Sequence, residues 1–429
     1  MTSIDIRHGD CLTVLRELPD NSVDSVVTDP PYGLSNTKPA QVADVLAAWV
    51  TGDTEAVPAK KGGFMGKDWD SFVPPPAVWA ECLRVLKPGG HMAVFAGART
   101  QDLMGLSIRL AGFEIRDTLG WVYGSGFPKS MDVSKAIDKA AGAERATKLV
   151  PSAATAYAAS AGNHRPWMDE ASANGGMRAV AGDTPATDEA QKWYGWGTAL
   201  KPAIEPIILA RKPLDGTVAA NVLAHGVGGL NIDASRVPSN EITGWGGRGH
   251  ASGGASLNLS ATGSSDGQPN PSQGRFPANV LLDEHAAKEM DEQSGVLKSG
   301  AHKAGQPRNA QSKSSFTLND ITTYSDSGSE GGASRFFPVF KYQAKAPKKE
   351  RPVIVREDGT KIAHPTVKPV ALMEWLVTLI TPEGGTTLDP FAGTGTTLQA
   401  ARDKGFNAIG VEQDEDYIAL IEQRLEIVA

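Results

Sequence analysis

Short apolar runs alternate with helical patterns in the first third of the chain. Strand-like runs stand at 25–28, 92–95 and 115–122. Before the second run, Val78, Cys82 and Val85 recur at helical spacing, and the Lys-Pro-Gly-Gly sequence at 87–90 is expected to end that helix before the strand begins. Such alternation predicts an α/β fold, with a parallel sheet covered by helices.

The same alternation resumes at His364 and continues to the end of the chain. A strand is expected at 386–388, a helix from about Thr396 to Lys404 capped by Gly405, and a strand at 407–411 with Glu412 at its carboxyl end. Before them, four residues share one helix face, which predicts a helix that is mainly core. They are Leu372, Trp375, Leu376 and Leu379.

The middle of the chain has a different composition. Stretches at about 141–193, 238–273 and 294–334 are rich in Gly, Ser, Ala, Asn and Gln, which is typical of long loops or disorder. Neither end has enough strands for its own sheet, so 141–363 is interpreted as an insertion into one domain formed by 1–140 and 364–429. Residues 193–212 are expected to return to that sheet, with a strand at 204–209 near its far edge.

Two sequence motifs each follow the end of a predicted strand. The stretch VDSVVTDPPYGLS leaves a strand at Asp29 and enters two prolines, which fix φ twice and remove two N–H donors, so that the turn is rigid. In LDPFAGTGTTL, a strand ends at Asp389 and a glycine loop opens a helix. Glycines let a ligand approach the backbone, and a carboxylate at the end of the next strand can accept hydrogen bonds from a ribose, which predicts a nucleoside site.

A dinucleotide does not suit this loop. Leu398 stands where the third glycine of a dinucleotide motif would fall, and Asp389 would repel a pyrophosphate but suit the amino group of an amino-acid-bearing nucleoside. The cofactor expected from these residues is therefore S-adenosyl-L-methionine.

Length, charge and cysteine content narrow the class of protein. The 429 residues can bury a large core, and the net charge of −7 argues against a generally basic nucleic-acid coat protein. The two cysteines have neither disulfide nor zinc spacing, so no metal site is expected. With no apolar run long enough for a membrane span, we expect a soluble protein of a bacterial or phage-infected cytoplasm.

The paired motifs, in this order and with a long insert between them, resemble the amino-methylating DNA methyltransferases that act on adenine N6 or cytosine N4. The order resembles the circularly permuted beta group of that family, and the resemblance covers roughly 4–127 and 364–425. It implies an S-adenosylmethionine-dependent methyltransferase fold and a site-specific enzyme that acts on double-stranded DNA. Asp in the first motif position accompanies adenine in the family, which favours adenine N6.

The resemblance assigns roles to residues. The catalytic motif comprises Asp29, Pro30, Pro31 and Tyr32. Cofactor contacts are expected from Asp10, His364, Thr366, Asp389, Phe391, Gly393, Gly395 and Glu412. Asp10 is expected to bind the cofactor's adenine, although a helix N-cap explains it nearly as well. Phe391 is explained about equally well by packing, and Trp375 is expected to be a packing residue.

The chemistry of an exocyclic amino group explains the first motif. Its lone pair is delocalised into the base, and hydrogen bonds to Asp29 and to the Pro30 carbonyl localise that pair on nitrogen. Tyr32 is expected to stack on the base, which must be flipped out of the duplex. Transfer would be direct and in line, so neither Cys11 nor Cys82 is needed as a nucleophile.

DNA recognition is expected in the middle of the chain. Candidates are Tyr123, Phe127 and Lys129, which an ordinary strand-to-helix connection explains equally well, and the basic run at 340–352, which a solvated face would also explain. Alternatives within the prediction are a cytosine-N4 enzyme and a non-catalytic nucleic-acid-binding relative. A homodimer stays open, and any restriction nuclease would be a separate chain.

Overall fold

A computed structural model describes residues 2–35, 37–58, 70–124, 126, 130–151, 177–238, 274–298, 330–340, 351–356, 358–364 and 366–426. The chain divides into two compact units, one formed by Met1–Ser125 with Ala203–Ala429 and the other by Gly126–Pro202. In the part of the chain covered by these ranges, no helix has both the length and the apolar character needed to cross a membrane.

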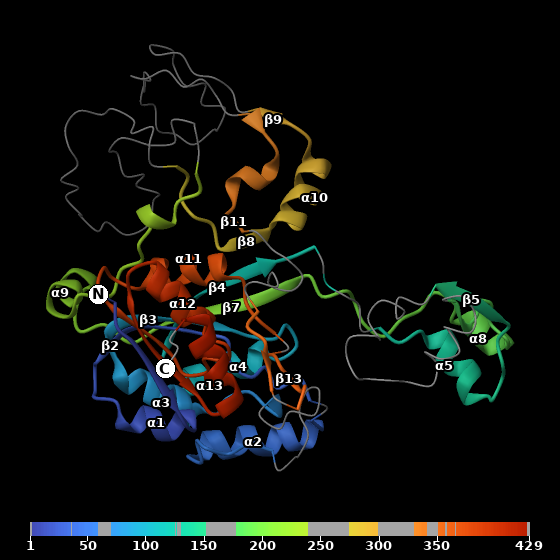
Figure 1. Ribbon diagram of the computed structural model, residues 1–429, viewed down its shortest axis with the longest axis horizontal. Helices are drawn as coiled ribbons and strands as arrows, with labels where there is room; N and C mark the ends of the chain where they lie inside the picture. The colour runs from blue at the N-terminus through green and yellow to red at the C-terminus, as the bar shows by residue number, and fades with distance from the viewer. Residues whose placement is uncertain are drawn as a thin grey trace, which may run out of the picture. The chain divides into compact units, whose positions relative to one another are not determined.

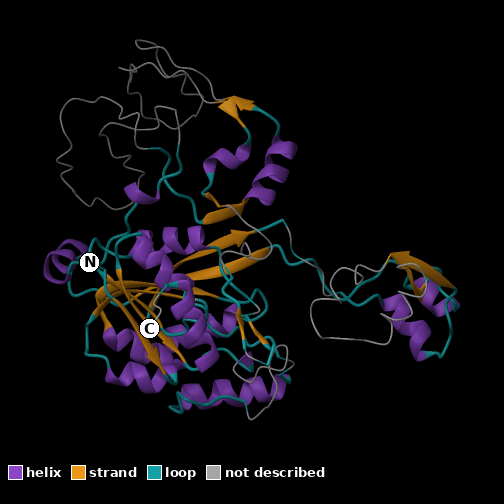
Figure 2. Ribbon diagram, in the orientation of Figure 1, coloured by secondary structure: helices purple, strands orange, loops and turns teal. Residues whose placement is uncertain are grey.

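One large sheet organises the first unit. Among the described residues it has nine strands in the order β1-β15-β14-β2-β3-β7-β4-β8-β11. Figure 2 shows the strands in orange between purple helices. They are β1 (Ile4–His8), β2 (Val23–Thr28), β3 (Leu86–Phe95), β4 (Glu114–Val122), β7 (Ile204–Arg211), β8 (Val280–Asp283), β11 (Val339–Phe340), β14 (Thr386–Asp389) and β15 (Asn407–Glu412). Neighbours from β1 to β3 are parallel, whereas β7 is antiparallel to both β3 and β4. The expected mostly parallel sheet is confirmed.

Helices cover both faces of this sheet (Figure 1). Every residue of β2 is buried, and Val26 packs in one apolar cluster while Val27 packs in the other, as the two-residue period of a strand requires. The Val26 cluster includes residues of α1 (Cys11–Glu17), α2 (Pro39–Thr51), α3 (Pro76–Val85) and α4 (Gln101–Leu110). The Val27 cluster includes residues of α11 (Val370–Ile380), α12 (Thr396–Asp403) and α13 (Glu415–Arg424). The fold is therefore doubly wound, and β2, which leads into the Asp-Pro-Pro-Tyr motif, precedes β14, which leads into the glycine loop, in the sequence.

Smaller elements complete the first unit. They are α9 (Val218–His225), η4 (Asp233–Ser235), α10 (Glu284–Ser294), β9 (Leu297–Lys298), β10 (Glu330–Gly331), η5 (Ala333–Phe336), β12 (Ile354–Val355) and β13 (Lys361–Ile362). Strand β9 pairs with β10, and β12 pairs with β13, both antiparallel.

Three expectations about the elements are corrected. The helix α3 ends at Val85, but β3 begins directly at Leu86, so the Lys-Pro-Gly-Gly sequence lies within the strand. Strand β7 is not near the far edge of the sheet, because it pairs on both sides and β4, β8 and β11 lie beyond it. Parts of the low-complexity stretches are ordered, since β9 and β10 fall within 294–334 and several elements of the second unit fall within 141–193.

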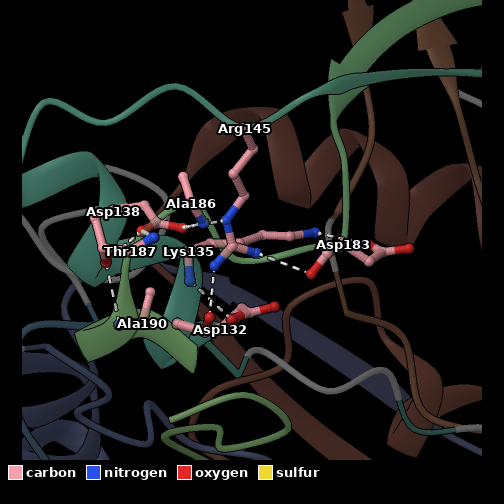
Figure 3. A network of polar contacts seen from close by, with 9 residues as sticks. Asp132, Lys135, Asp138, Arg145, Asp183, Ala186, Thr187 and Ala190 are labelled. Atoms are coloured by element: carbon pink, nitrogen blue, oxygen red, sulfur yellow. Dashed lines mark hydrogen bonds and ion pairs between the residues drawn. The ribbon is translucent and has the colours of Figure 1, made fainter. Parts of the chain in front are cut away.

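The second unit is held together by a buried polar network. It comprises α5 (Val133–Ala140), β5 (Thr147–Pro151), β6 (Met177–Ala181) and α8 (Asp188–Lys192), with β5 and β6 antiparallel. Arg145 Nε donates to Asp138 Oδ2 at 2.6 Å (Figure 3). Arg145 Nη2 donates to the Ser134 hydroxyl at 2.5 Å. Burial would raise the pKa of Asp138, but hydrogen bonds from Ala186 and Thr187 and the charge of Arg145 lower it to about 2. Asp138 therefore stays ionised at neutral pH and keeps its ion pair with Arg145.

The chain leaves the sheet after β4 and returns to it at β7. The Tyr123 N–H donates to the Ala203 carbonyl at 3.1 Å, directly beyond the antiparallel pair formed by Val122 and Ile204. The two ends of the segment between them therefore meet at the sheet.

Candidate active site

The two sequence motifs open at the same edge of the sheet. Strand β2 ends at Thr28 and β14 at Asp389, and the two strands are adjacent and parallel, with Leu388 opposite Val26. The Thr28 hydroxyl donates to Asp389 Oδ1 at 2.7 Å, so a direct hydrogen bond joins the end of one strand to the end of the other. The two motifs therefore follow neighbouring strands that run in the same direction.

The turn after Asp29 is fixed from several directions. Gly33 has a φ of 64°, and a Cβ there would lie 2.7 Å from the Val73 nitrogen, so only glycine fits. Its N–H donates to Asp70 Oδ1 at 2.9 Å, and the Thr100 hydroxyl donates to the Tyr32 carbonyl at 2.6 Å. The Pro-Pro-Tyr segment is thus held by contacts as well as by its own rings.

The Asp29 carboxylate has two partners in the described residues. Tyr32 donates its hydroxyl to Oδ1 at 2.7 Å, and the Lys368 ammonium lies 2.9 Å from Oδ2. Lys368 also lies 3.1 Å from Glu205 Oε2 and donates to the Tyr32 hydroxyl oxygen at 3.0 Å. The ammonium is 4.8 Å from the centre of the Phe95 ring and 5.3 Å from that of Tyr32. One lysine therefore bridges two carboxylates under two aromatic rings.

The charge states in this cluster follow from its contacts. Burial alone would lower the pKa of Lys368, but the charges of Asp29 and Glu205 and the hydrogen bonds to them raise it above its usual value. Burial raises the pKa of Tyr32 well above its ordinary value, and the two carboxylates raise it further. Lys368 is consequently a cation and Tyr32 a neutral hydroxyl.

Glu412 lies where a ribose acceptor was predicted, at the carboxyl end of β15. Its Oε2 accepts from the Gly393 N–H at 2.8 Å and its Oε1 from the Asp414 N–H at 2.9 Å. Burial raises the pKa of this carboxyl to about 7, although the backbone hydrogen bonds act in the opposite direction. The group therefore titrates close to neutral pH.

The glycine loop needs its glycines for different reasons. Gly393 has a φ of 55°, and a Cβ there would face the His364 ring, with Nε2 3.6 Å away. Gly395 has a φ of 73° at the N-cap of α12, and a Cβ there would lie 2.9 Å from Ile421. A side chain at 393 would project towards His364, whereas one at 395 would collide with α13.

Asp389 lies beneath the loop rather than at its surface. It is 2% exposed, and its oxygens accept from the Thr28 hydroxyl, from the Phe391 N–H at 3.1 Å and from the Thr397 hydroxyl at 2.6 Å. Burial raises its pKa to about 6 despite these hydrogen bonds. Asp389 thus joins β2, the loop and α12, and its predicted contact with a cofactor stays a prediction.

Asp10, another predicted cofactor residue, lies at the start of α1. Asp10 is the N-cap of α1, and its Oδ1 accepts from the Thr13 N–H at 3.0 Å. Gly9, the residue after β1, donates its N–H to the Glu412 carbonyl at 2.9 Å, which brings the start of α1 beside the end of β15. The helix-cap explanation of Asp10 is therefore correct, and it leaves Oδ2 for a second partner.

His364, Thr366 and Phe391 take part in local contacts. The His364 ring packs edge-on against Tyr417 with ring centres 4.7 Å apart, and its Nδ1 contacts the backbone N–H and carbonyl groups of Thr366. The Phe391 ring is 6.2 Å from that of Trp79. This contact agrees with a packing role for Phe391, and its predicted contact with a cofactor stays a prediction.

The cysteines are not suited to nucleophilic attack. Burial raises the pKa of Cys11 to about 12, and burial raises that of the core residue Cys82 well above its usual value. Both thiols are therefore protonated at neutral pH.

Three residues of this site were not predicted from the sequence. Lys368 belongs to the HPTVKP segment but gave no signal beyond its charge, and Asp70 gave none at all. Glu205 lies at this edge because β7 is antiparallel to β3, so that the first residues of β7 stand beside the last residues of β3. Only the direction of β7 could have revealed it.

Several predicted DNA contacts cannot be placed. Phe127, Lys129 and most of the basic run, at 341–350, lie outside the described residues. Tyr123 is described and is 8% exposed, as part of the core.

Known proteins share the sequence pattern. The sequence model of the N6_N4_Mtase family, described as DNA methylase, matches residues 23–160 and 229–423. The type II methyltransferase M.HindIII of Haemophilus influenzae is 22% identical over 441 residues, covering 98% of this chain and 95% of that protein. The type II methyltransferase M.ScaI of Streptomyces caespitosus is 39% identical over 74 residues, covering 17% of this chain and 24% of that protein. This chain therefore spans about a quarter of the length of M.ScaI.

Solved structures give weaker likenesses. The PvuII DNA methyltransferase, described as cytosine-N4-specific, has a TM-score of 0.42 at 13% identity, covering 99% of this chain and 87% of that one. The complex of M1.HpyAVI with SAM has a TM-score of 0.37 at 13% identity, covering 98% of both chains. The family match extends over more than half of the sequence and includes both motifs at the edge of the sheet, so this chain belongs to the N6_N4 DNA methylase family.

Proposed function

We propose that the protein transfers a methyl group from S-adenosyl-L-methionine to the exocyclic N6 of adenine in duplex DNA, by base flipping and direct in-line transfer. The observation that carries the proposal is the joining of the two motifs at one edge of the sheet, through the hydrogen bond from Thr28 to Asp389. A methyl donor held by the glycine loop and a base held after β2 would then meet over the same strands.

The residues around the glycine loop suit this cofactor. Gly393 keeps clear the space in front of His364 that a Cβ would enter, and Glu412 offers a carboxylate at the end of β15 for ribose hydroxyls. Asp10 lies beside them for the adenine amino group, and Thr366 and Phe391 are further contacts. When bound, the cofactor supplies a methyl group on a sulfonium, which needs no covalent intermediate on the protein.

Asp29 and the Pro30 carbonyl would accept the two protons of the target amino group. Those hydrogen bonds localise the nitrogen lone pair and so raise its nucleophilicity. The ring of Pro31 fixes the direction of the Pro30 carbonyl, and Asp70 and Thr100 hold the turn from either side. Tyr32 would support the flipped base by stacking.

Adenine is favoured over cytosine by Asp29 alone, because aspartate at this motif position accompanies adenine in the family. Both amino groups undergo the same chemistry, so cytosine N4 is the alternative product. The proposal is tested by incubating the protein with methyl-labelled S-adenosylmethionine and unmethylated duplex DNA, then digesting the DNA to nucleosides.

We expect label in N6-methyldeoxyadenosine, and a loss of about 10²-fold or more in turnover for Asp29→Ala with little change in cofactor affinity. Label in N4-methyldeoxycytidine would overturn the adenine assignment. Absence of label would indicate a non-catalytic relative, and near-normal transfer by Asp29→Ala would exclude the proposed mechanism.

A further inference from the structure

The Lys368 ammonium is shared between two carboxylates that come from separate strands. Asp29 follows β2, and Glu205 lies in β7. The side chains of Lys368, Asp29 and Glu205 are 12%, 23% and 27% exposed, so the cluster is shielded from bulk water without being closed to it. In the part of the chain that the structure describes, Lys368 is the one ion-pair partner of either carboxylate.

This contact poses a difficulty for Asp29 as an acceptor. A cation 2.9 Å from Oδ2 withdraws electron density from the carboxylate and weakens the hydrogen bond that it can accept from an amino group. A lysine paired with Asp29 alone would give a neutral pair. Because Glu205 lies 3.1 Å from the same ammonium, the three groups together carry a net charge of −1.

We propose that Lys368 and Glu205 are a charge-balanced pair of positioning residues, in which Lys368 orients the Asp29 carboxylate and Glu205 offsets the lysine's charge. The inference rests on the proposed role of Asp29. Two aromatic rings and the Tyr32 hydroxyl hold the ammonium in place, so its position does not depend on Asp29. If Asp29 accepts a hydrogen bond from the target amino group, the negative charge that remains would lie beside the nitrogen that becomes positive when the methyl group leaves the sulfonium.

The contacts of Tyr32 and Lys368 with Asp29 also leave its carboxylate able to accept a hydrogen bond from a bound base. When a base binds, an amino group can use the second lone pair of an Asp29 oxygen while Lys368 keeps its contact with Oδ2. The carboxylate then cannot rotate away, because Tyr32 and Lys368 hold one oxygen each. Glu205 itself needs no contact with the base. Its Oε2 also lies 3.4 Å from the Tyr32 hydroxyl, and the effect of its charge passes through Lys368 to Asp29.

A double-mutant cycle on the full chain tests the charge balance, with the single-turnover rate of methyl transfer to DNA as the readout. Glu205→Gln keeps the shape but removes the charge, and should lower the rate on the order of tenfold, with KM values for DNA and cofactor nearly unchanged. Glu205→Asp, which keeps the charge, should retain more of the rate than Glu205→Gln. In the Lys368→Met background, Glu205→Gln should cost nothing or increase the rate, because no cation is left to offset.

Equal losses from Glu205→Gln in both backgrounds would overturn the proposal, as would equal rates for Glu205→Asp and Glu205→Gln. Thermal melting of each variant checks the fold, and Lys368→Gln replaces Lys368→Met if the latter does not fold. The matched control is the pair of Lys404 and Glu374, 3.3 Å apart, where Lys404→Met and Glu374→Gln should show neither loss nor coupling. An active Asp29→Ala variant would refute the proposed function, whereas an inactive one with an uncoupled cycle would refute only this inference.

Discussion

At the scale of single residues, Glu412 has an unusual position for a carboxylate. It is buried to 9% exposure, yet each of its oxygens accepts a backbone N–H. Burial disfavours the charge and brings the pKa to about 7, while the N–H groups keep ionisation accessible at neutral pH. A group balanced in this way responds to small changes in pH and to any ligand that donates hydrogen bonds to it.

This balance predicts pH-dependent cofactor binding. Ribose hydroxyls bind an ionised carboxylate more strongly than a protonated one, and ionisation of a group with a pKa near 7 increases about tenfold between pH 6 and pH 8. The affinity for S-adenosylmethionine should therefore rise by up to about tenfold over this range. Calorimetric titration measures it, and Glu412→Gln should bind more weakly at pH 8 with a flatter profile. An equally steep profile in that variant would assign the titration to another group.

At the scale of elements, the junction of β2 and β14 joins the two halves of the proposed site. The Thr28 hydroxyl is fully buried and donates to a carboxylate that is itself buried. A donor removed from such a place leaves an acceptor with one hydrogen bond fewer and no water to replace it. The geometry of both loops depends on this contact, since Asp29 follows Thr28 directly and Asp389 begins the glycine loop.

Replacement of Thr28 by valine isolates the contribution of this hydrogen bond. Valine has nearly the same shape, so Thr28→Val should lower the free energy of unfolding by about 1–3 kcal/mol and reduce methyl transfer as the two strand ends separate. Urea denaturation gives the first quantity. Thr51→Val, at an exposed hydroxyl that donates to the Ala47 carbonyl, is the control and should change stability by less than about 0.5 kcal/mol. Equal effects of the two variants would show that the buried contact adds nothing.

The elements that could be predicted are those whose signals are local. The ends of β2 and β14 are marked by an aspartate followed by proline, and the turn glycines at 393, 395 and 405 all have positive φ. Strand β7 was recognised as a strand but placed wrongly in the sheet, because pairing with β3 and β4 depends on long-range contacts. Glu205 was missed for the same reason, since its approach to Lys368 follows from the direction of β7.

At the scale of the whole molecule, the two compact units are stabilised differently. The first buries large apolar clusters on both faces of its sheet. The second has the ion pair of Arg145 and Asp138 at its centre, with side chains 3% and 2% exposed. A buried ion pair depends on every one of its partners, so a small unit of this kind is more sensitive to single substitutions than the sheet. The composition of residues 141–193 did not reveal that parts of this stretch form strands and a helix.

The hydrogen bond between Tyr123 and Ala203 closes off residues 124–202, a segment that includes the second unit and is called the cassette below. Strands β4 and β7 would form an ordinary hairpin if a tight turn replaced 124–202, so the whole unit is inserted at a hairpin tip, where chains tolerate insertion and deletion well. A variant that joins Tyr123 to Ala203 through Asn-Gly should keep the sheet and bind S-adenosylmethionine as tightly as the full chain in calorimetry. Loss of cofactor binding would show that the sheet depends on the cassette. Replacement of residues 124–202 by another segment would then leave intact the sheet that carries Asp29 and Glu412.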